Sequence, residues 1–145
     1  MLATGLDAAI SLAASSVPFT LAAGDFQPSA RSFVGPLVMA TLRRIHPDTV
    51  FFSAKGFTVE SGFTDPYLAE VETKSQLIAS GRQVIALLDH SKFGRTALYT
   101  LADLTAVDVV ITDREPSGEV REALEAAQVQ LVIADGSFAE SPRPR

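Results

Sequence analysis

Apolar segments alternate with segments of helical periodicity along most of this chain. The apolar segments are FTLAA (19–23), TVFFSA (49–54), QVIALL (83–88), DVVIT (108–112) and QLVIA (130–134). They are apolar almost throughout instead of at every second position, which is typical of strands in a parallel sheet covered on both faces. Because helical segments separate them, we expect an α/β fold with a mostly parallel sheet.

Four of the intervening segments have helical spacing or helix-end signals: 7–15, 36–45, 65–81 and 117–127. Gly35-Pro36 is expected to open the second, with proline in the first turn. In the third, Asp65 is expected to cap the helix before Pro66 and Gly81 to end it. The apolar face of that helix is expected to carry Leu68, Val71, Ser75 and Ile78.

The length of 145 residues fits one domain, which we place at 1–136, with a flexible tail at 137–145 that contains two prolines. No cysteine is present, so disulfides and thiolate metal sites are excluded. The two histidines lack partners at metal-ligand spacing. We therefore expect neither a metal nor a cofactor.

The chain carries a net charge of −5. Direct DNA binding requires a basic surface, which this composition does not provide. No apolar run reaches the roughly 20 residues of a membrane-spanning helix, and the first residues lack a basic signal-peptide region. We expect a soluble, cytoplasmic protein without membrane contact.

One polar cluster, DHSKFGR at 89–95, directly follows the apolar segment 83–88. In parallel α/β sheets, ligands bind beyond the carboxyl ends of the strands. That rule predicts that the loops at 24–25, 55–56, 89–95 and 113–114 gather at one edge. The sequence therefore predicts the ligand site at this edge.

Lys55, Lys92 and Arg95 fall in or beside these loops, although the whole chain is acidic. A local basic site of this kind suits a small anion better than a polyanion. Ser91, the backbone at Gly94 and the Lys92 ammonium together have the groups to hold a phosphate. The alternative is that the cations are solvated loop charges.

Three further features each allow a structural and a functional interpretation. Glu70 and Lys74 are spaced as a surface ion pair of a helix, or Lys74 points into the ligand cleft. His90 is a general base or a hydrogen-bonded loop residue. Phe57 and Phe63 form the floor of a sugar site or pack in the core. Nucleophile-elbow, P-loop and dinucleotide-binding motifs are absent from the sequence.

Five motifs carry a resemblance to a known family. They are SFVGP (32–36), FFSAKG (51–56), GFTDPYLAEVETK (62–74), DHSKFGRTAL (89–98) and VDVVITD (107–113). In order and spacing they resemble the C-terminal effector-binding (sensor) domain of DeoR-family bacterial transcriptional regulators, over about 4–135. The resemblance implies a Rossmann-like three-layer sandwich related to ribose-5-phosphate isomerase and glucosamine-6-phosphate deaminase. It also implies a sensor that binds a phosphorylated sugar or related metabolite and alters DNA binding by an attached winged helix-turn-helix, as repressors of this family do.

The resemblance also implies effector-binding positions: Lys92, Ser91, Asp89, Lys74, Gly24, Lys55, Thr4 and Gly5. In the related isomerases, the lysine of the loop that matches Lys92 contacts the sugar phosphate. Gly24 matches the second glycine of a Gly-Gly turn. Gly5 stands where family members usually have asparagine, which puts an amide contact from that position in doubt.

Lys55 marks a departure that bears on catalysis. The related isomerases carry proton-transferring acids just after the strand that matches 51–54, and Lys55 replaces the first of them. Loss of a general base costs on the order of 10² to 10⁴ in rate. We therefore expect a sensor and not an enzyme. A sugar-phosphate isomerase or deaminase and an assembly module without a ligand site are the alternatives.

The start of the chain is a second departure. Family members begin with the winged helix-turn-helix, followed by a first sheet strand whose turn cradles phosphate. Against this pattern, the chain is expected to begin just before the end of the second strand, to lack the family's first strand and to contact DNA only through an absent domain. Unpaired strand edges seek partners, and we expect a homo-oligomer.

Overall fold

A four-stranded parallel sheet organises the C-terminal two thirds of the protein. In this computed structural model, which describes residues 1–134, the strand order is β11–β10–β8–β5. The strands are β5 (Thr49–Phe52), β8 (Gln83–Leu87), β10 (Val109–Thr112) and β11 (Gln130–Ile133). Each coincides with a predicted strand to within two residues, and all three pairings are parallel. The α/β prediction is confirmed, whereas the expected tail at 137–145 lies outside the described residues.

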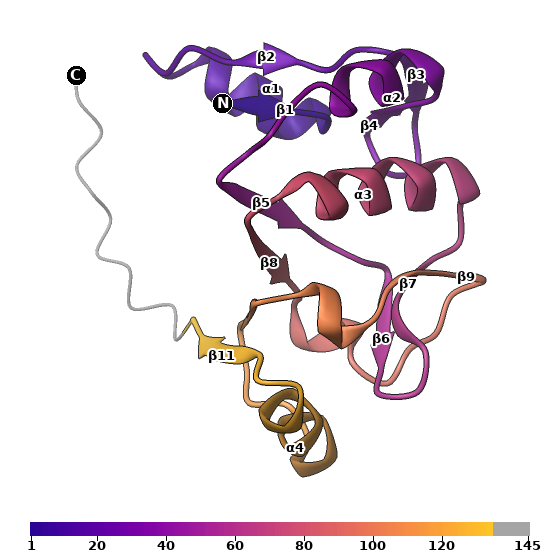
Figure 1. The fold of residues 1–145 in the computed structure, drawn as a ribbon, viewed down its shortest axis with the longest axis vertical. Coiled ribbons are helices and arrows are strands. Elements are labelled where there is room, and N and C mark those ends of the chain that lie inside the picture. Colours follow the sequence, from indigo (N-terminus) through magenta and orange to yellow (C-terminus); the bar gives the residue numbers. More distant parts are fainter. Residues whose placement is uncertain (135–145) are drawn as a thin grey trace.

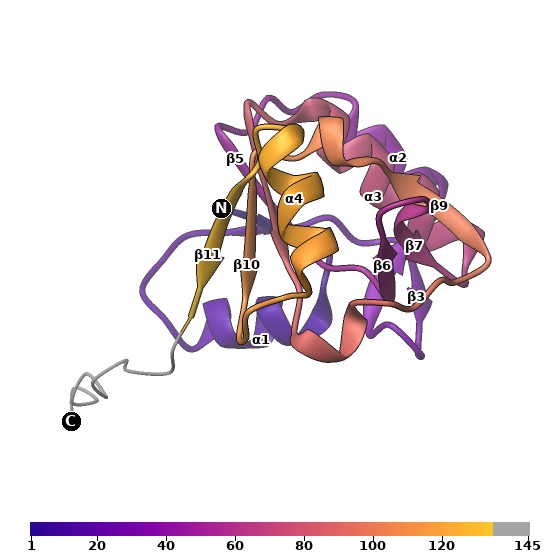
Figure 2. The same cartoon turned by 90° about the horizontal axis from the view of Figure 1, so that it is seen from below.

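One face of this sheet packs on α3 (Leu68–Ser80) and α4 (Gly118–Ala126), as Figures 1 and 2 show. Val84, Ala86 and Val110 on the sheet meet Ile78 of α3 and Leu124 of α4 in one buried cluster. The opposite face is less completely covered. Phe51 and Leu87 there are 54% and 42% exposed.

A second, antiparallel sheet packs against α3. Its order is β6–β7–β9, with β6 (Gly56–Thr58), β7 (Gly62–Asp65) and β9 (Tyr99–Ala102). Phe57 and Phe63 are almost completely buried, with ring centroids 4.8 Å apart. Core packing is therefore their role, as the structural interpretation held. The alternation of apolar segments did not predict this sheet, because β6 and β7 each begin with a glycine and none of the three strands is a continuous apolar run.

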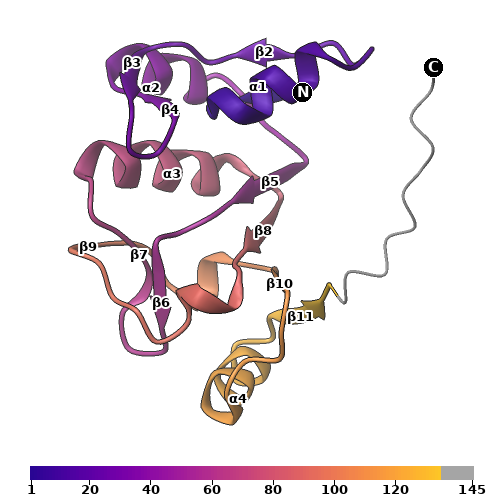
Figure 3. The ribbon, with the colours of Figure 1, turned by 180° about the vertical axis from the view of Figure 1, so that it is seen from behind.

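The first 42 residues form a separate layer on the other side of α3, visible at the top of Figures 1 and 3. The elements are β1 (Leu2–Ala3), α1 (Leu6–Ala13), β2 (Thr20–Leu21), β3 (Asp25–Gln27), β4 (Ser32–Val34) and α2 (Pro36–Leu42). β1 pairs with β2 in parallel, and β3 and β4 form a hairpin. We call residues 1–45 the N-terminal layer and residues 49–134 the C-terminal body. The predicted strand 19–23 is reduced to two residues.

The start of α3 differs from the prediction. Tyr67, not Asp65, is the N-cap, and Asp65 is the completely buried last residue of β7. Its carboxylate accepts a hydrogen bond from the Tyr67 backbone N–H at 3.3 Å. Leu68 is half exposed, so the predicted apolar face is wrong at its first position. The predicted end of α3 at Gly81 is confirmed, and the Ser117 side chain caps α4.

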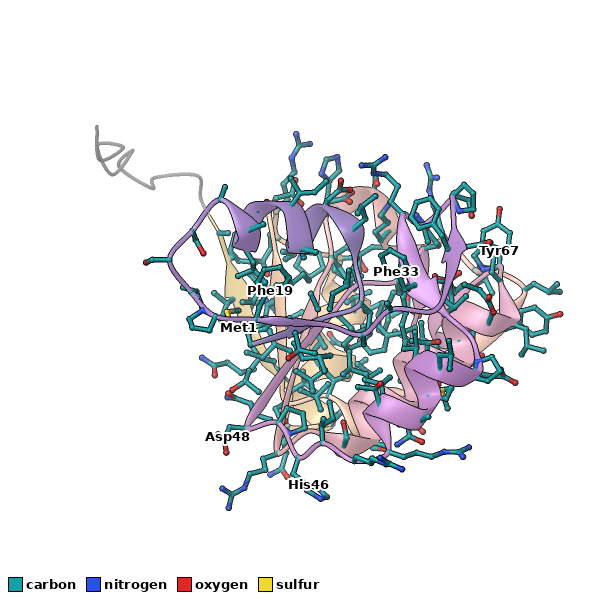
Figure 4. All side chains as sticks on the ribbon, turned by 90° about the horizontal axis from the view of Figure 1, so that it is seen from above. Met1, Phe19, Phe33, His46, Asp48 and Tyr67 are labelled. Atoms are coloured by element: carbon teal, nitrogen blue, oxygen red, sulfur yellow. The ribbon has the colours of Figure 1, made fainter. Side chains whose placement is uncertain are left out.

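The N-terminal layer and the parallel sheet approach each other without pairing. Within the described residues, β1 pairs only with β2 and β5 only with β8. A groove of about 370 Å³ with a mainly apolar lining, including Leu2, Ala3, Val50 and Phe51, separates the two strands. Figure 4 looks onto this layer, with Met1 and Phe19 at the β1–β2 pair and His46 and Asp48 where the chain passes to β5.

Candidate functional site

A cleft of about 370 Å³ lies between the N-terminal layer, the carboxyl end of β5 and one side of α3. We call it the central cleft. Its polar lining comes from segments far apart in sequence: Thr4, Gly5, Ser32, Ser53, Lys55, Glu70, Thr73, Lys74 and Lys92. Phe33, Phe51, Phe52 and Leu77 supply apolar walls. The volume is in the range of small-molecule sites, about 300–1,000 Å³.

All three lysines of the chain line the central cleft. Lys55 follows β5, Lys74 belongs to α3, and Lys92 ends the short 3₁₀ helix η1 (His90–Lys92). None of the arginines in residues 1–134 lines it. Because the protein as a whole is acidic, this convergence makes the cleft the local basic site that the strand-end rule predicted.

Backbone contacts hold the loops at 55–56 and 89–95 against the antiparallel sheet. The Lys55 N–H donates to the Thr64 carbonyl at 2.9 Å, and the Gly94 N–H donates to the Phe57 carbonyl at 2.9 Å. At Gly56, an added Cβ would lie 2.3 Å from the Arg95 carbonyl oxygen. Only glycine permits this close approach. The loop that carries Lys92 is therefore fixed against β6, next to Lys55.

Asp89 and Ser91 do not line the cleft. The Asp89 carboxylate accepts a hydrogen bond from the Ser91 N–H at 2.9 Å and so caps η1. Hydrogen bonding from Ser91 lowers the pKa of Asp89, and the Lys92 ammonium, 3.7 Å away, acts in the same direction. These two residues shape the turn that presents Lys92.

His90 also lies outside the cleft lining. Its backbone N–H and its Nδ1 lie 2.5 and 2.7 Å from the two carboxylate oxygens of Asp113, at the end of β10. This contact lowers the pKa of Asp113. Of the two interpretations of His90, the geometry shows the hydrogen-bonded loop residue, which ties η1 to the sheet.

The wall formed by α3 is polar and buried. Glu70, Thr73, Lys74 and Leu77 face the cleft with the i, i+3, i+4, i+7 spacing of one helix side. Lys74 Nζ lies 2.8 Å from Asp65 Oδ2 and 3.4 Å from Glu70 Oε2, and Ser32 Oγ donates to Glu70 Oε1. Glu70 is only 2% exposed. Of the two interpretations of Lys74, the geometry favours the one in which it points into the cleft. Its ion pair with Glu70 is present, but it is buried and not on the surface.

Thr4 and Gly5 form the wall opposite α3. The Phe33 N–H donates to the Thr4 carbonyl and the Leu6 N–H to the Arg31 carbonyl, both at 2.8 Å. These bonds fasten the Thr4-Gly5 segment to the β3–β4 hairpin. The cleft thus has one wall from each part of the molecule.

Gly24 lies outside the lining and has a packing role. An added Cβ there would lie 2.5 Å from the Val34 carbonyl oxygen and 2.8 Å from Val38 Cγ2. The loops at 24–25 and 113–114 therefore do not line the cleft with those at 55–56 and 89–95, in contrast to the gathering that the sequence predicts.

The structure brings together five of the eight predicted effector-binding positions: Thr4, Gly5, Lys55, Lys74 and Lys92. Sequence reasoning missed Ser32, Glu70 and Thr73. The polar helical spacing from Glu70 to Leu77 is the signal that points to two of them, whereas nothing local marks Ser32. Among the described residues, no group of three or more His, Asp or Glu side chains has the arrangement of a metal site. No helix there is long and apolar enough to cross a membrane.

Comparison with known proteins gives one family and several relatives. The family described as the DeoR C terminal sensor domain matches residues 2–114. The HTH-type transcriptional repressor GlcR of Bacillus subtilis is 32% identical over 79% of this chain and 44% of its own length. The deoxyribose operon repressor of Escherichia coli is 30% identical over 77% and 44% of the two chains. The glycerol-3-phosphate regulon repressor of Escherichia coli is 28% identical over 78% of this chain and 45% of its own length. The chain spans about half the length of the relatives it matches.

Proposed function

The chain belongs to the family of DeoR C-terminal sensor domains, which are parts of transcriptional regulators, and from this we propose that its central cleft binds a phosphorylated sugar or related small metabolite. Binding in the cleft changes how a helix-turn-helix domain of the regulator holds DNA. The observation that carries this proposal is the convergence of all three lysines on one cleft of an acidic protein.

Lys92 and Lys55 are the proposed phosphate ligands. Lys92 is paired with Asp89 only at 3.7 Å, and its side chain is 27% exposed. Within residues 1–134, Lys55 has no ion-pair partner. Both ammonium groups are therefore available to an anion.

Lys74 has a different proposed part. Its charge is shared by Asp65 and Glu70 at 2.8 and 3.4 Å, so it contributes less to holding phosphate. We assign it to orienting the remainder of the ligand, together with the backbone of Thr4 and Gly5 across the cleft. Asp89 and Ser91 act on the ligand indirectly, because they hold the turn that carries Lys92.

The proposed response to the ligand follows from the two walls. A ligand that contacts Lys92 and the Thr4-Gly5 segment bridges the C-terminal body and the N-terminal layer. It therefore binds one relative arrangement of the two parts more tightly and shifts the population toward that arrangement. Two relatives support this choice of ligand by their names: one is a glycerol-3-phosphate regulon repressor, and the other is a deoxyribose operon repressor.

A thermal-shift screen over sugar and polyol phosphates tests the proposal. A ligand present at a hundred times its Kd stabilises the protein by about 2.7 kcal/mol, which is readily measured. Lys92→Ala is expected to weaken binding about 10- to 100-fold, since hydrogen bonds to charged groups contribute about 1.5–3 kcal/mol.

The matched control is Arg82→Ala, which removes an exposed cation outside the cleft. It is expected to leave affinity unchanged. The proposal fails if no phosphate ester stabilises the wild-type protein, or if the two variants respond alike.

An isomerase or deaminase activity is the alternative, and the cleft argues against it. Glu70 is the one carboxylate that lines the cleft in the described part of the chain, and Ser32 and Lys74 already engage it. A general base must be free to take a substrate proton. We expect no turnover of ribose 5-phosphate or glucosamine 6-phosphate, and steady product formation in a coupled assay would favour the enzyme.

We also propose that the chain self-associates. The free edge of β5 and the exposed Phe51 and Leu87 offer backbone and apolar surface to a second copy. Sedimentation velocity at micromolar concentration is expected to show a dimer or larger species. A single monomeric boundary would exclude it, and association without any ligand response would favour the assembly-module alternative.

A further inference from the structure

Thr73 has a buried hydroxyl that nothing in the protein uses. Thr73 lies near the middle of α3. Its side chain is 3% exposed and lines the central cleft. Its Oγ1 is the single buried side-chain nitrogen or oxygen atom among residues 1–134 without a hydrogen-bond partner. Buried polar groups are nearly always paired, so an unpaired one requires an explanation.

Other hydroxyls on α3 show the usual solutions. Ser80 Oγ donates to the Leu77 carbonyl one turn back at 2.7 Å, and Ser75 Oγ donates to the Leu101 carbonyl at 2.7 Å. A helical threonine commonly bonds to the carbonyl three or four residues before it in the same way. Thr73 does neither, although valine would fill the same space without the penalty of an unpaired hydroxyl.

The charged groups next to Thr73 are already paired with one another. Lys74 lies between Asp65 and Glu70, and Ser32 occupies the other oxygen of Glu70. A phosphate gains little at this end of the cleft, because the carboxylates repel it. The cations that we propose as phosphate ligands, Lys55 and Lys92, come from the strand-end loops instead. The cleft therefore has one part suited to an anion and another suited to an uncharged polar group.

We infer that Thr73 Oγ1 is a specificity-determining ligand contact, which hydrogen-bonds to an uncharged hydroxyl of the small molecule whose anionic group meets Lys55 and Lys92. This inference rests on the proposed function. Threonine in a helix has two accessible χ1 rotamers, so the hydroxyl is able to change direction when a ligand is bound. The ligand is thus a phosphorylated polyol or sugar and not a bare anion, because inorganic phosphate satisfies only the cations.

The test is the near-isosteric substitution Thr73→Val, with Thr73→Ser as the conservative variant that keeps the hydroxyl. Calorimetric titrations use ribose 5-phosphate, glycerol 3-phosphate and inorganic phosphate as probes. Thr73→Val is expected to weaken the tightest-binding phosphate ester about tenfold, equivalent to about 1.4 kcal/mol, and to leave inorganic phosphate within about twofold. Thr73→Ser is expected to retain most of the affinity.

Lys92→Ala separates the two halves of the site, because it is expected to weaken the ester and inorganic phosphate alike. The inference is overturned if Thr73→Val binds the ester as tightly as wild type, or loses affinity for inorganic phosphate to the same degree. If the wild-type protein itself binds none of the esters, the proposed function fails first and the inference fails with it.

Thermal unfolding without ligand provides an independent readout. An unpaired hydroxyl contributes nothing to the free protein, so Thr73→Val is expected to unfold at the same temperature as wild type or a higher one. A fall of several degrees would show that the hydroxyl has a structural partner and would overturn the inference.

Discussion

The N-terminal layer and the C-terminal body both contribute to the central cleft, but they differ greatly in how they are held together. The buried apolar cluster of the body contains fifteen residues. The corresponding cluster of the layer contains three, Ala22, Val38 and Leu42, and the layer is also the part with the smaller sheets. Its sheets contain only two strands each, of two or three residues. Two-stranded sheets are marginally stable by themselves.

From this difference we expect the wall contributed by the N-terminal layer to be the one that moves. Regions with few buried contacts open locally at low free energy, and ligand-responsive elements come from them. Lys55, Lys74 and Lys92 belong to the better-packed body, and Thr4 and Gly5 to the layer. We therefore expect the body to hold the ligand and the layer to respond to it.

The largest expected effect is in the body. Phe63 contacts Phe52 and Phe57, with centroids 5.2 and 4.8 Å away, and is fully buried. Phe63→Ala is expected to lower the free energy of unfolding by about 3–5 kcal/mol. Urea denaturation followed by circular dichroism measures this, and a loss under 1 kcal/mol would contradict the assigned core.

The second effect concerns the junction of the two parts. Lys74→Met keeps the length of the side chain but leaves Asp65 and Glu70 buried without a counter-charge. We expect destabilisation by about 3 kcal/mol, since breaking a buried ion pair costs about 3–5 kcal/mol. Lys92→Ala, which removes a partly exposed cation whose pair with Asp89 spans 3.7 Å, serves as the control and is expected to cost less than about 0.5 kcal/mol.

A third prediction tests the layer itself. Leu42→Ala truncates one of the three residues of its buried apolar cluster and is expected to cost about 2 kcal/mol. Hydrogen exchange should then accelerate in residues 1–45 while the amides of β8 and β10 keep their protection. Uniform acceleration across both parts would show that they unfold as a single unit, and the comparison would not hold.

The smallest effect depends on pH. Hydrogen bonds from Arg31, at 2.7–3.0 Å, lower the pKa of Asp7 in the layer, as His90 lowers that of Asp113 in the body. Such a group stabilises the fold above its ordinary pKa of 3.8, and that stability is lost as the pH falls through the lower folded value. NMR titration of the carboxyl carbons should give midpoints below 3.8 for both. A midpoint at or above the ordinary value would disprove the contact concerned.

The apolar segments predicted the parallel sheet well, because each strand of that sheet is a continuous local run. The antiparallel sheet escaped prediction for the opposite reason. None of its strands is a continuous apolar run, and their pairing joins residues as distant as Phe63 and Ala102. The family motifs added the sensor-domain assignment, which the family match over residues 2–114 confirms.

For the site, the sequence alone determined that lysine-bearing loops follow the strand ends and that the chain carries a net charge of −5. Only the tertiary structure decided which polar groups are buried. Glu70 and Lys74 have the spacing of a surface ion pair. The N-terminal layer packs over this side of α3, however, and so buries Glu70 and Asp65, the two partners of Lys74. Burial depends on what packs over a helix, and residues distant along the chain supply that cover. The same packing leaves Thr73 without a partner, which no local pattern reveals.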